Sequence, residues 1–342
     1  MRQSFPGRFL RCPVCHTERS LTLEARAAND VEVREGTLRC GHCTHAFGVH
    51  RGVGELLVDP PQHVRREAEG LERFAAHMRE SGWDRDRILN LPDEPDDGYW
   101  FVQAATFDQL IDLLKPQPGQ SIVDVGSNTC WATNRFARAG LNAIALDIAT
   151  AELQGLYTAD FFLEEGSYFE RILGTMSDMP IASASLDYVY CCEVLHHNDL
   201  RGLWRTFREA HRVLKPGGRL LVANETLKTL RDPHGLHVEG VAEYEGYEHA
   251  HWALHYELGA RAAGFSIELI EPAYRWIFDP HHLWVPADTP PLEATRRVVH
   301  YVRRRWKPTR RLQLAWINHV IGGSQFSMIA TKPGRASAGA AK

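Results

Sequence analysis

The chain has 342 residues, of which 44% are hydrophobic and 24% charged, so it can bury two domain cores. Its formal net charge of -4 provides no general electrostatic reason for it to bind nucleic acid or a membrane surface. No apolar run approaches the ~20 residues that span a bilayer, and the first residues lead into a Pro-Gly turn without a signal-peptide core. We therefore expect a cytoplasmic protein without a transmembrane segment.

Four cysteines near the N-terminus form two Cys-x-x-Cys pairs: Cys12 with Cys15, and Cys40 with Cys43. Each spacing lets both sulfurs of one turn face the same ion, and four thiolates complete a closed tetrahedral zinc site. Because such a site has no open position for water, we expect structural zinc. The alternatives are buried thiols or a redox pair. Cys130, Cys191 and Cys192 are scattered and odd in number, which argues against a disulfide framework.

The segment between the two pairs alternates apolar and polar residues around a turn at Asn29-Asp30; its apolar positions are Leu21, Leu23, Val31, Val33 and Leu38. This alternation predicts a hairpin with one metal-binding turn at each end of its sequence. An aromatic-apolar stretch over 46–58 follows, with a Gly turn and a final Leu56-Leu57 pair. It resembles the end of the Trm112-like zinc-ribbon family, whose members activate methyltransferases or are fused to them. The resemblance covers about the first 60 residues.

A polar stretch with a helical pattern runs from Gln62 to about Arg87, and a Pro/Asp-rich loop follows at Leu91 to Gly98. From Tyr99 onward strand and helix patterns alternate, which predicts a parallel α/β sheet. We therefore expect a zinc-ribbon domain, a helical linker, a larger α/β domain and a flexible tail, at 1–60, 61–98, 99–333 and 334–342.

The first two strand patterns of the α/β domain predict a nucleoside-cofactor site. Ser121 to Asn128 is an apolar strand that runs into a turn at Gly126, and a helix pattern begins at Trp131. The next strand, residues 143–146, ends at Asp147. An acid at this strand tip can accept both hydroxyls of a ribose, and a Gly turn lets the ligand approach the backbone closely.

The details of the turn favour S-adenosyl-L-methionine (SAM) over a dinucleotide. A dinucleotide fold would have a Gly-x-Gly-x-x-Gly turn, whereas only Gly126 is present here. Asp124 would repel a phosphate but suits a cationic group such as the amino acid end of SAM; a turn-capping role is its alternative. The segment resembles the first motif of class I methyltransferases, although Asn128 and Cys130 stand where that family usually has glycine.

Two later segments resemble the same family. Residues 173–180 look like its adenine-binding segment, with Thr175 where an acid often contacts the adenine amine and Met176 offering backbone atoms. Residues 187–197 resemble the fourth-strand segment of ubiquinone/menaquinone-type methyltransferases. An amphipathic helix follows and ends at Lys215-Pro216-Gly217-Gly218 before a strand at 219–223. Strands six and seven are expected at 265–270 and 325–331.

The resemblance implies an α/β fold: a Rossmann-like class I methyltransferase sheet, mainly parallel with an antiparallel last strand, beside a small N-terminal zinc ribbon. It also implies SAM as cofactor. The positions that it places near SAM are Asp124, Gly126, Ser127, Asn128, Asp147, Thr175, Met176 and Cys192. Cys192 would offer at most a backbone contact.

Deprotonation of an acceptor needs a base with a pKa near the operating pH, which makes histidine the first candidate. We select His197, His251 and His255, of which His197 could instead be structural. His251 and His255 are four residues apart and would share a helix face. That face could bind the acceptor, hold a metal with a nearby carboxylate, or remain polar without chemistry. Both adjoin a His- and Glu-rich cap expected at 226–256, which also contains His234, His237 and His249.

A long insertion is expected at 272–323, between the last two strands. It contains a run of basic residues from Arg296 to Arg311 and no acid from Ala294 to Ala315. The run could form a solvated lid or bind an anionic acceptor.

Together these features predict a SAM-dependent methyltransferase that acts on a small-molecule or carrier-linked acceptor, with an anionic acceptor as one option. One alternative is an rRNA or tRNA methyltransferase that uses the ribbon to contact RNA. Against it, the head is only mildly basic and no Asn-Pro-Pro-Tyr-like motif follows the fourth strand, where Cys192 to Leu195 stand. A third reading is a cofactor-binding module without catalysis.

Overall fold

The computed structural model describes residues 1–93, 98–230, 233, 249–271, 274–276, 284–286, 312, 314–315, 317–321 and 326–334. Much of the predicted cap at 226–256 and most of the insertion at 272–323 lie outside these residues. The basic run from Arg296 to Arg311 and the candidates His234 and His237 lie wholly outside them.

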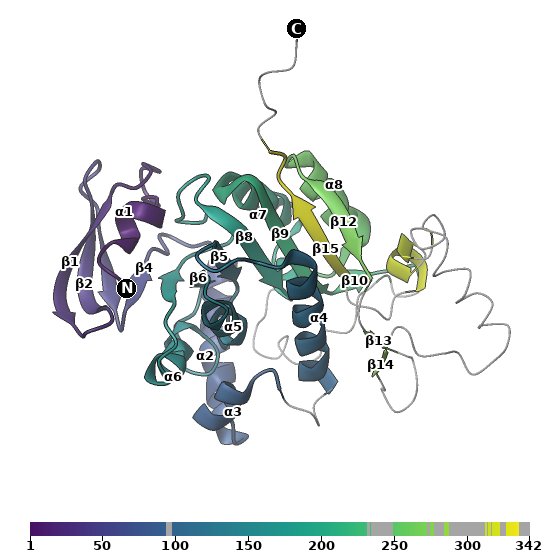
Figure 1. Ribbon diagram of the computed structural model, residues 1–342, viewed down its shortest axis with the longest axis horizontal. Helices are drawn as coiled ribbons and strands as arrows, with labels where there is room; N and C mark the ends of the chain where they lie inside the picture. The colour runs from purple at the N-terminus through teal and green to yellow at the C-terminus, as the bar shows by residue number, and fades with distance from the viewer. Residues whose placement is uncertain are drawn as a thin grey trace, which may run out of the picture.

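One mixed sheet runs through the described part of the molecule, and its strand order is β1-β2-β3-β4-β7-β6-β5-β8-β9-β15-β12 (Figure 1). Its strands are β1 (Leu21–Ala28), β2 (Val33–Cys40), β3 (Ala46–His50), β4 (Val53–Glu55), β5 (Ser121–Val125), β6 (Asn142–Asp147), β7 (Glu170–Leu173), β8 (Leu186–Cys192), β9 (Leu214–Glu225), β12 (Ser266–Ile270) and β15 (Phe326–Thr331). Two short pairs lie apart from it: β10 (Leu227–Lys228) with β11 (His251–Trp252), and β13 (Tyr274–Trp276) with β14 (Trp284–Pro286).

The strand directions confirm the predicted fold class. Strands β7, β6, β5, β8 and β9 are parallel to their neighbours, as the alternation of strand and helix patterns indicated. The last strand, β15, is antiparallel to both β9 and β12. The predicted hairpin is also present, because Leu21 pairs with Cys40 and Leu23 with Leu38 across β1 and β2.

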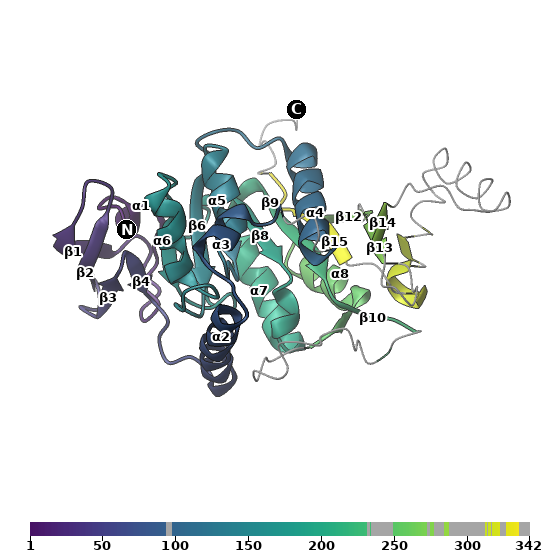
Figure 2. The same cartoon turned by 90° about the horizontal axis from the view of Figure 1, so that it is seen from below.

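Helices cover both faces of the sheet (Figure 2). They are α1 (Phe5–Phe9), α2 (Gln62–Glu80), α3 (Arg85–Asn90), α4 (Gly98–Leu114), α5 (Trp131–Arg138), α6 (Ala159–Glu164), α7 (Leu200–Val213) and α8 (Ala253–Ala262), with short 3-10 turns η1 (Leu156–Thr158) and η2 (Leu195–His197) and a π-helical turn η4 (Ile317–Ile321). Phe107 of α4 and Phe136 of α5 pack on one face of the sheet with Tyr190. Phe207 of α7 and Tyr256 of α8 belong to the core on the other face.

The boundary between α7 and β9 differs from the expectation. The helix ends at Val213, and β9 begins directly at Leu214, so that the Lys-Pro-Gly-Gly segment belongs to the strand. An irregularity in the pairing of β8 with β9 between Leu186 and Tyr188 accommodates it. Gly217 has a φ of 82°, a backbone conformation that glycine adopts without steric cost.

The N-terminal head, residues 1–60 with the four paired cysteines, is joined to the α/β body through the sheet itself. Strand β4 pairs in parallel with β7, and Leu56 N donates to Leu173 O at 3.0 Å just beyond the pairing. One apolar core continues from Phe9 and Leu10 of the head to Ile181 of the body. Figure 1 shows the head at one end of an elongated molecule.

Buried charges also cross this seam between head and body. The Arg171 side chain on β7 is completely buried and pairs with Glu32 of the head and with Asp160 of α6. Arg34 and Arg51, both from the head, bind Asp160 at 2.7 and 2.8 Å. Each of these charged side chains therefore has an oppositely charged partner, which is the condition under which proteins tolerate buried charges.

Candidate functional site

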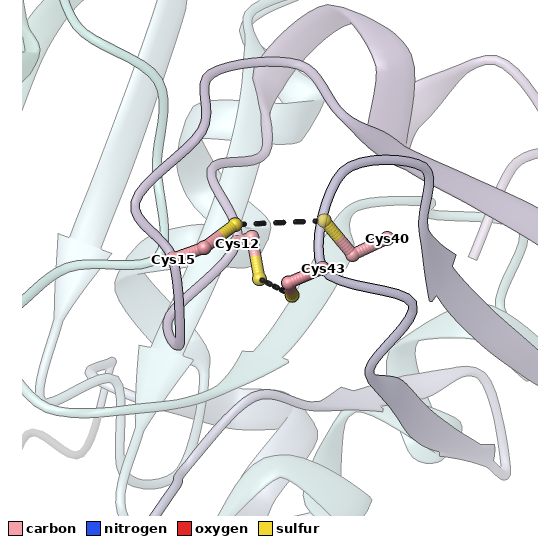
Figure 3. Close-up of side chains that lie close together, drawn as sticks. All are labelled: Cys12, Cys15, Cys40 and Cys43. Carbon is pink, nitrogen blue, oxygen red and sulfur yellow. Dashed lines mark hydrogen bonds between the residues drawn. The ribbon is translucent and has the colours of Figure 1, made fainter.

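The four N-terminal cysteines form a cluster with the geometry of a tetrahedral thiolate site. Their sulfur atoms all lie within 4.8 Å of one another, and Figure 3 shows the two turns directing them toward a common point. Cys12 Sγ lies 3.7 Å from Cys43 Sγ, and Cys15 Sγ lies 3.7 Å from Cys40 Sγ. Zn–S bonds of about 2.3 Å in a tetrahedron require sulfur separations of about 3.8 Å. The donor set therefore fits a zinc ion.

The two Cys-x-x-Cys turns have matching backbone structures. His16 N donates to Cys12 O at 2.9 Å, and Thr44 N donates to Cys40 O at 3.0 Å. Both His16 and Thr44 adopt positive φ, at 56° and 61°. Burial alone would raise the pKa of Cys40, but the Cys43 backbone N–H and the Ser20 hydroxyl outweigh it and lower the pKa to about 6. Hydrogen bonds from Thr17 also lower the pKa of Cys15, whereas burial raises the pKa of Cys12 to about 12, so the thiolate, the form that binds metal, is favoured at Cys15 and Cys40.

A cavity of about 210 Å³ lies at the carboxyl ends of β5, β6, β7 and β8, bordered by α2 and α7. This edge of a parallel sheet is where α/β folds bind their ligands. Many of the positions predicted to bind SAM line it: Gly126, Asn128, Asp147, Thr175 and Met176.

Asp147 is held in place at the tip of β6 by two backbone donors. Its Oδ2 accepts from Asn128 N at 2.8 Å, and its Oδ1 accepts from Ala149 N at 3.0 Å. Burial raises its pKa to about 6, although these donors favour the ionised form. Asn128 adopts a φ of 45°, and its Nδ2 donates to Gln154 at 2.8 Å. The Asn128 Oδ1 atom is buried and has no hydrogen-bond partner among the described residues, so it can accept a hydrogen bond from a ligand.

The Gly turn after β5 is tightly packed against the end of β8. Gly126 has a φ of 69°, and a Cβ added there would lie 2.3 Å from Val194 Cγ2. Only glycine fits this position, both for backbone conformation and for space. The close contact places the residues after β5 and β8 at one end of the cavity.

The structure places three predicted cofactor residues away from the cavity wall. Asp124 lies within β5 and faces α5, where it accepts a hydrogen bond from Thr133 Oγ1 at 2.5 Å. Burial raises the pKa of Asp124 to about 7. Ser127 is buried under the turn beside Cys130, and Cys192 Sγ donates to Gln103 Oε1 of α4 at 3.0 Å. Successive side chains of a strand point to opposite faces of the sheet. Val123 and Val125 pack on one face, so Asp124 between them points to the other face.

Of the three candidate bases, His197 alone lines the cavity. Its Nδ1 lies 2.8 Å from Glu67 Oε1, a carboxylate on α2. His251 Nε2 donates to Asn198 O at 2.9 Å, and burial lowers the pKa of His251 to about 4. Burial also lowers the pKa of His255.

The predicted helix face shared by His251 and His255 does not form. His251 lies in β11, whereas α8 begins only at Ala253, so the two residues do not belong to one helix. Their rings still meet edge to face with centroids 5.8 Å apart. Across the described ranges, the four-cysteine cluster is the only group of three or more His, Cys, Asp or Glu residues arranged to hold a metal ion. The structure therefore provides no support for a metal at the two histidines.

Several cavity residues were not selected from the sequence: His63, Glu67, Glu193, Arg201 and Arg205. The sequence contained a pattern that could have identified Glu67. Val64, Glu67 and Leu71 share one face of α2, and all three line the cavity. An acid within an otherwise apolar stripe indicates a buried polar contact. Glu193 follows β8, but the sequence does not show which way its side chain points.

The parallel strands and the antiparallel last strand give this chain the class I methyltransferase fold, with the cavity at the carboxyl ends of the parallel strands. Residues 123–222 match the family model described as a methyltransferase domain. This range runs from within β5 to within β9 and includes the cavity positions from Val125 to Arg205. This part of the chain is therefore similar to methyltransferase domains.

Three curated relatives are similar to this chain over the same domain. The 27-O-demethylrifamycin SV methyltransferase of Amycolatopsis mediterranei is 30% identical over 153 residues, which are 42% of this chain and 54% of the relative. The ubiquinone/menaquinone biosynthesis C-methyltransferase of Cereibacter sphaeroides is 34% identical over 118 residues, 34% of this chain and 46% of the relative. The malonyl-[acyl-carrier protein] O-methyltransferase of Hahella chejuensis is 32% identical over 133 residues, 38% of this chain and 45% of the relative. The chain spans about half the length of these relatives.

In the part of the chain that the structure describes, no helix is both long enough and apolar enough to cross a membrane.

Proposed function

We propose that the protein is a SAM-dependent methyltransferase that modifies a small-molecule or carrier-linked acceptor. The cavity at the ends of β5 to β8 carries this proposal, because it combines the Gly126 turn with Asp147 at the tip of the neighbouring strand. The names of the three relatives refer to a rifamycin, to quinone biosynthesis and to a malonyl group on an acyl-carrier protein. Each name therefore points to an acceptor that is a small molecule or a carrier-linked metabolite.

Several cavity residues can each be assigned to one part of SAM. Asp147 would accept the ribose hydroxyls, and the segment around Thr175 and Met176 would contact the adenine. The buried Asn128 Oδ1 offers an acceptor in the same cavity. When bound, SAM supplies the electrophilic methyl group. The contribution of the protein is to align the acceptor and exclude water.

His197 is proposed as the base that removes the acceptor proton, with Glu67 as its positioning residue. The Glu67 carboxylate lies against Nδ1, so it favours the tautomer that keeps the proton on Nδ1 and leaves Nε2 as the basic nitrogen. Glu67 also stabilises the imidazolium that forms after proton transfer. Because Glu67 belongs to α2, the packing of this helix along the cavity supplies one member of the pair.

The head is proposed to be a Trm112-like zinc ribbon with a structural Zn2+ held by Cys12, Cys15, Cys40 and Cys43. The sulfur separations and the paired turns support this role. The seam with the body suggests that the zinc supports the docked head, since the Cys40–Cys43 turn joins β2 to β3, two strands of the sheet that also contains β4 and β7.

Two experiments test the activity. Calorimetry should show SAM binding to the protein, and Asp147→Ala should weaken it by about ten- to a hundredfold through loss of charge-assisted hydrogen bonds to the ribose. Methyl-labelled SAM should then be incubated with the protein and cell extract separated into RNA, lipid, protein and small-molecule pools. Label in the small-molecule or carrier-protein pool supports the proposal. Label in RNA alone would establish the RNA methyltransferase alternative, and SAM binding without any labelled pool would favour a module without catalysis.

The base can be tested on the labelled pool. His197→Ala should lower the labelling rate by about a hundredfold or more while leaving the SAM affinity within a few-fold. Glu67→Gln should lower it less and shift its pH dependence, because it keeps a side chain of the same shape beside His197 but removes the charge. His77→Ala, at an exposed position on the same helix as Glu67, is the control. Full activity of His197→Ala would remove His197 as the base.

A further inference from the structure

Glu193 is a cavity residue to which the proposed reaction assigns no role. It follows β8 directly, lines the cavity together with Val194, and adopts a positive φ of 48°. Residues other than glycine pay a steric cost in this region, so such backbone conformations persist where the surroundings impose them. Here the Glu193 N–H donates to Ala223 O of β9 at 3.1 Å, which fixes the backbone.

The order of the strands defines which end of the cavity Glu193 occupies. Going across the sheet, Thr175 follows β7, Asp147 ends β6, Gly126 follows β5, and Glu193 follows β8. With adenine near Thr175 and ribose at Asp147, the rest of SAM extends toward β5 and β8. That portion carries the positive sulfonium and the methyl group. Glu193 therefore lies at the cationic end of the cofactor.

The other carboxylates lining the cavity have different tasks. Glu67 contacts His197, and Asp147 receives two backbone N–H groups at the ribose end. Asp199 caps α7 by accepting from Gly202 N at 2.6 Å. Asp124, the acid first expected to meet the cationic end of SAM, points away from the cavity toward Thr133.

The surroundings of Glu193 make its charge sensitive to pH near neutrality. Burial raises its pKa to about 7, while the Tyr99 hydroxyl, which donates to Glu193 Oε2 at 2.5 Å, lowers it. The ionisable and polar groups that face it come from every neighbouring element: Tyr99 and Gln103 of α4, Tyr190 and Cys192 of β8, His196 of η2 and Glu225 of β9. His196 lowers the pKa and Glu225 raises it.

We propose that Glu193 is the carboxylate that stabilises the sulfonium charge of SAM, so that the cavity binds SAM in preference to S-adenosylhomocysteine, whose sulfur is neutral. The role rests on the proposed function, since it requires that the cavity holds SAM. Ionised Glu193 attracts the sulfonium, and protonated Glu193 does not. The preference for SAM should therefore grow as the pH rises through about 7. After methyl transfer the attraction is lost, which favours release of the product.

Calorimetric titrations with SAM and with S-adenosylhomocysteine at several pH values between about 6 and 8 test this role without any acceptor. In the unmodified protein, the ratio of the two dissociation constants should change about fivefold in favour of SAM over this range, as expected when SAM lowers the pKa of one carboxyl group by one unit from about 7. Asp147 also titrates near this range, with a pKa of about 6. Its contribution cancels in the ratio, because both ligands carry the same ribose.

Three variants sharpen the test. Glu193→Gln should bind S-adenosylhomocysteine normally, which shows that it is folded, and its ratio should no longer change with pH. Tyr99→Phe should move the change to higher pH, because the donor that favours the ionised carboxylate is lost. Glu268→Gln, on the exposed side of β12, should behave like the unmodified protein.

A pH-independent ratio in the unmodified protein, or the same change in Glu193→Gln, would overturn the role of Glu193 while leaving the proposed function in place. Failure of both ligands to bind to the folded protein would instead contradict the proposed function itself.

Discussion

The seam between head and body and the cofactor cavity both bury charged groups, but they stabilise them differently. At the seam, Arg171 offsets the burial of Glu32 and, together with Arg34 and Arg51, that of Asp160. Burial would raise the pKa values of Glu32 and Asp160, but these arginines outweigh it and lower both. Glu170 is an exception at the edge of the seam, since burial raises its pKa to about 7.

The carboxylates in and beneath the cavity receive hydrogen bonds from neutral groups. The donors are backbone N–H groups for Asp147, the Thr133 hydroxyl for Asp124 and the Tyr99 hydroxyl for Glu193. Burial raises the pKa of all three. The seam thus contains its own counter-charges, whereas these three carboxyl groups have neutral donors. Paired buried charges at the seam indicate structure, and raised carboxyl pKa values at the cavity indicate function.

Loss of the metal should have the largest effect on the seam. Zinc binding to four thiolates contributes about 10 kcal/mol or more to folding in small zinc domains, so chelation should unfold residues 1–60. Because β4 pairs with β7 just before Thr175, we also expect the SAM affinity to fall by about fivefold or more. Metal analysis, hydrogen exchange and calorimetry on the chelated protein measure these effects. Cys40→Ser should reproduce them; retention of one tightly bound zinc and an ordered head in this variant would contradict the site.

Substitution of Arg171, the buried cation at the centre of the seam, should have the next largest effect on stability. Arg171→Met removes the buried cation that Glu32 and Asp160 share, while Glu32 keeps the Met1 ammonium and Arg34 as partners, so the free energy of unfolding should fall by up to about 3–5 kcal/mol at neutral pH. Urea denaturation followed by circular dichroism measures the change. Arg26→Met, an exposed arginine on β1, should change it by less than about 0.5 kcal/mol. Equal stabilities of the two variants would show that the seam does not depend on its charge pairing.

Asp124→Asn tests a carboxyl group whose pKa is raised, in contrast to the lowered pKa values of Glu32 and Asp160 at the seam. The folded-state pKa of Asp124 is raised to about 7, so its contribution to stability is present below the unfolded-state value of 3.8 and is lost as the pH rises through about 7. The substitution should therefore make the decline of stability with pH shallower, by up to about 1.4 kcal/mol per pH unit in this window. Denaturation at a series of pH values measures the slope. SAM affinity should change by less than about threefold, since the side chain does not line the cavity; a larger loss would restore Asp124 as a cofactor residue.

Gly126→Ala should have the smallest effect on the free energy of unfolding among these changes. The added Cβ would approach Val194, and alanine at a positive φ costs about 1–2 kcal/mol. We expect the affinities for SAM and S-adenosylhomocysteine to fall equally, by about five- to thirtyfold. The reason is that the two ligands differ only at the sulfur, and the proposed contact with the sulfur is made by Glu193 and not by the Gly126 turn. Adding Val194→Ala should recover part of the loss by removing the clash. No recovery would mean that backbone strain alone explains the effect.

Much of both regions could be predicted from the sequence because the relevant contacts are local. The Cys-x-x-Cys spacing defines which sulfurs share a turn, and the alternation between Leu21 and Leu38 indicated the β1–β2 hairpin. The strand pattern placed Gly126 after β5 and Asp147 at the end of β6, because each position depends only on where its own strand ends.

Other features depended on contacts between distant segments. The pairing of β4 with β7, the placement of Glu67 against His197, and the closeness of Val194 to Gly126 each join residues far apart in the chain. No local pattern shows which strand edge another strand will meet, or over which face a helix will fold. The strand pattern likewise did not show that Asp124 faces α5 while Glu193 faces the cavity.

The sequence by itself determined a head with four clustered cysteines and an α/β domain with a Gly turn after its first strand and an acid at the tip of the next. The tertiary structure decided that head and domain share one sheet, which acids pair with arginine, and that Glu193 lines the cavity whereas Asp124 does not. The reason is that spacing and periodicity describe each segment alone, whereas burial and charge pairing exist only between segments that the fold brings together.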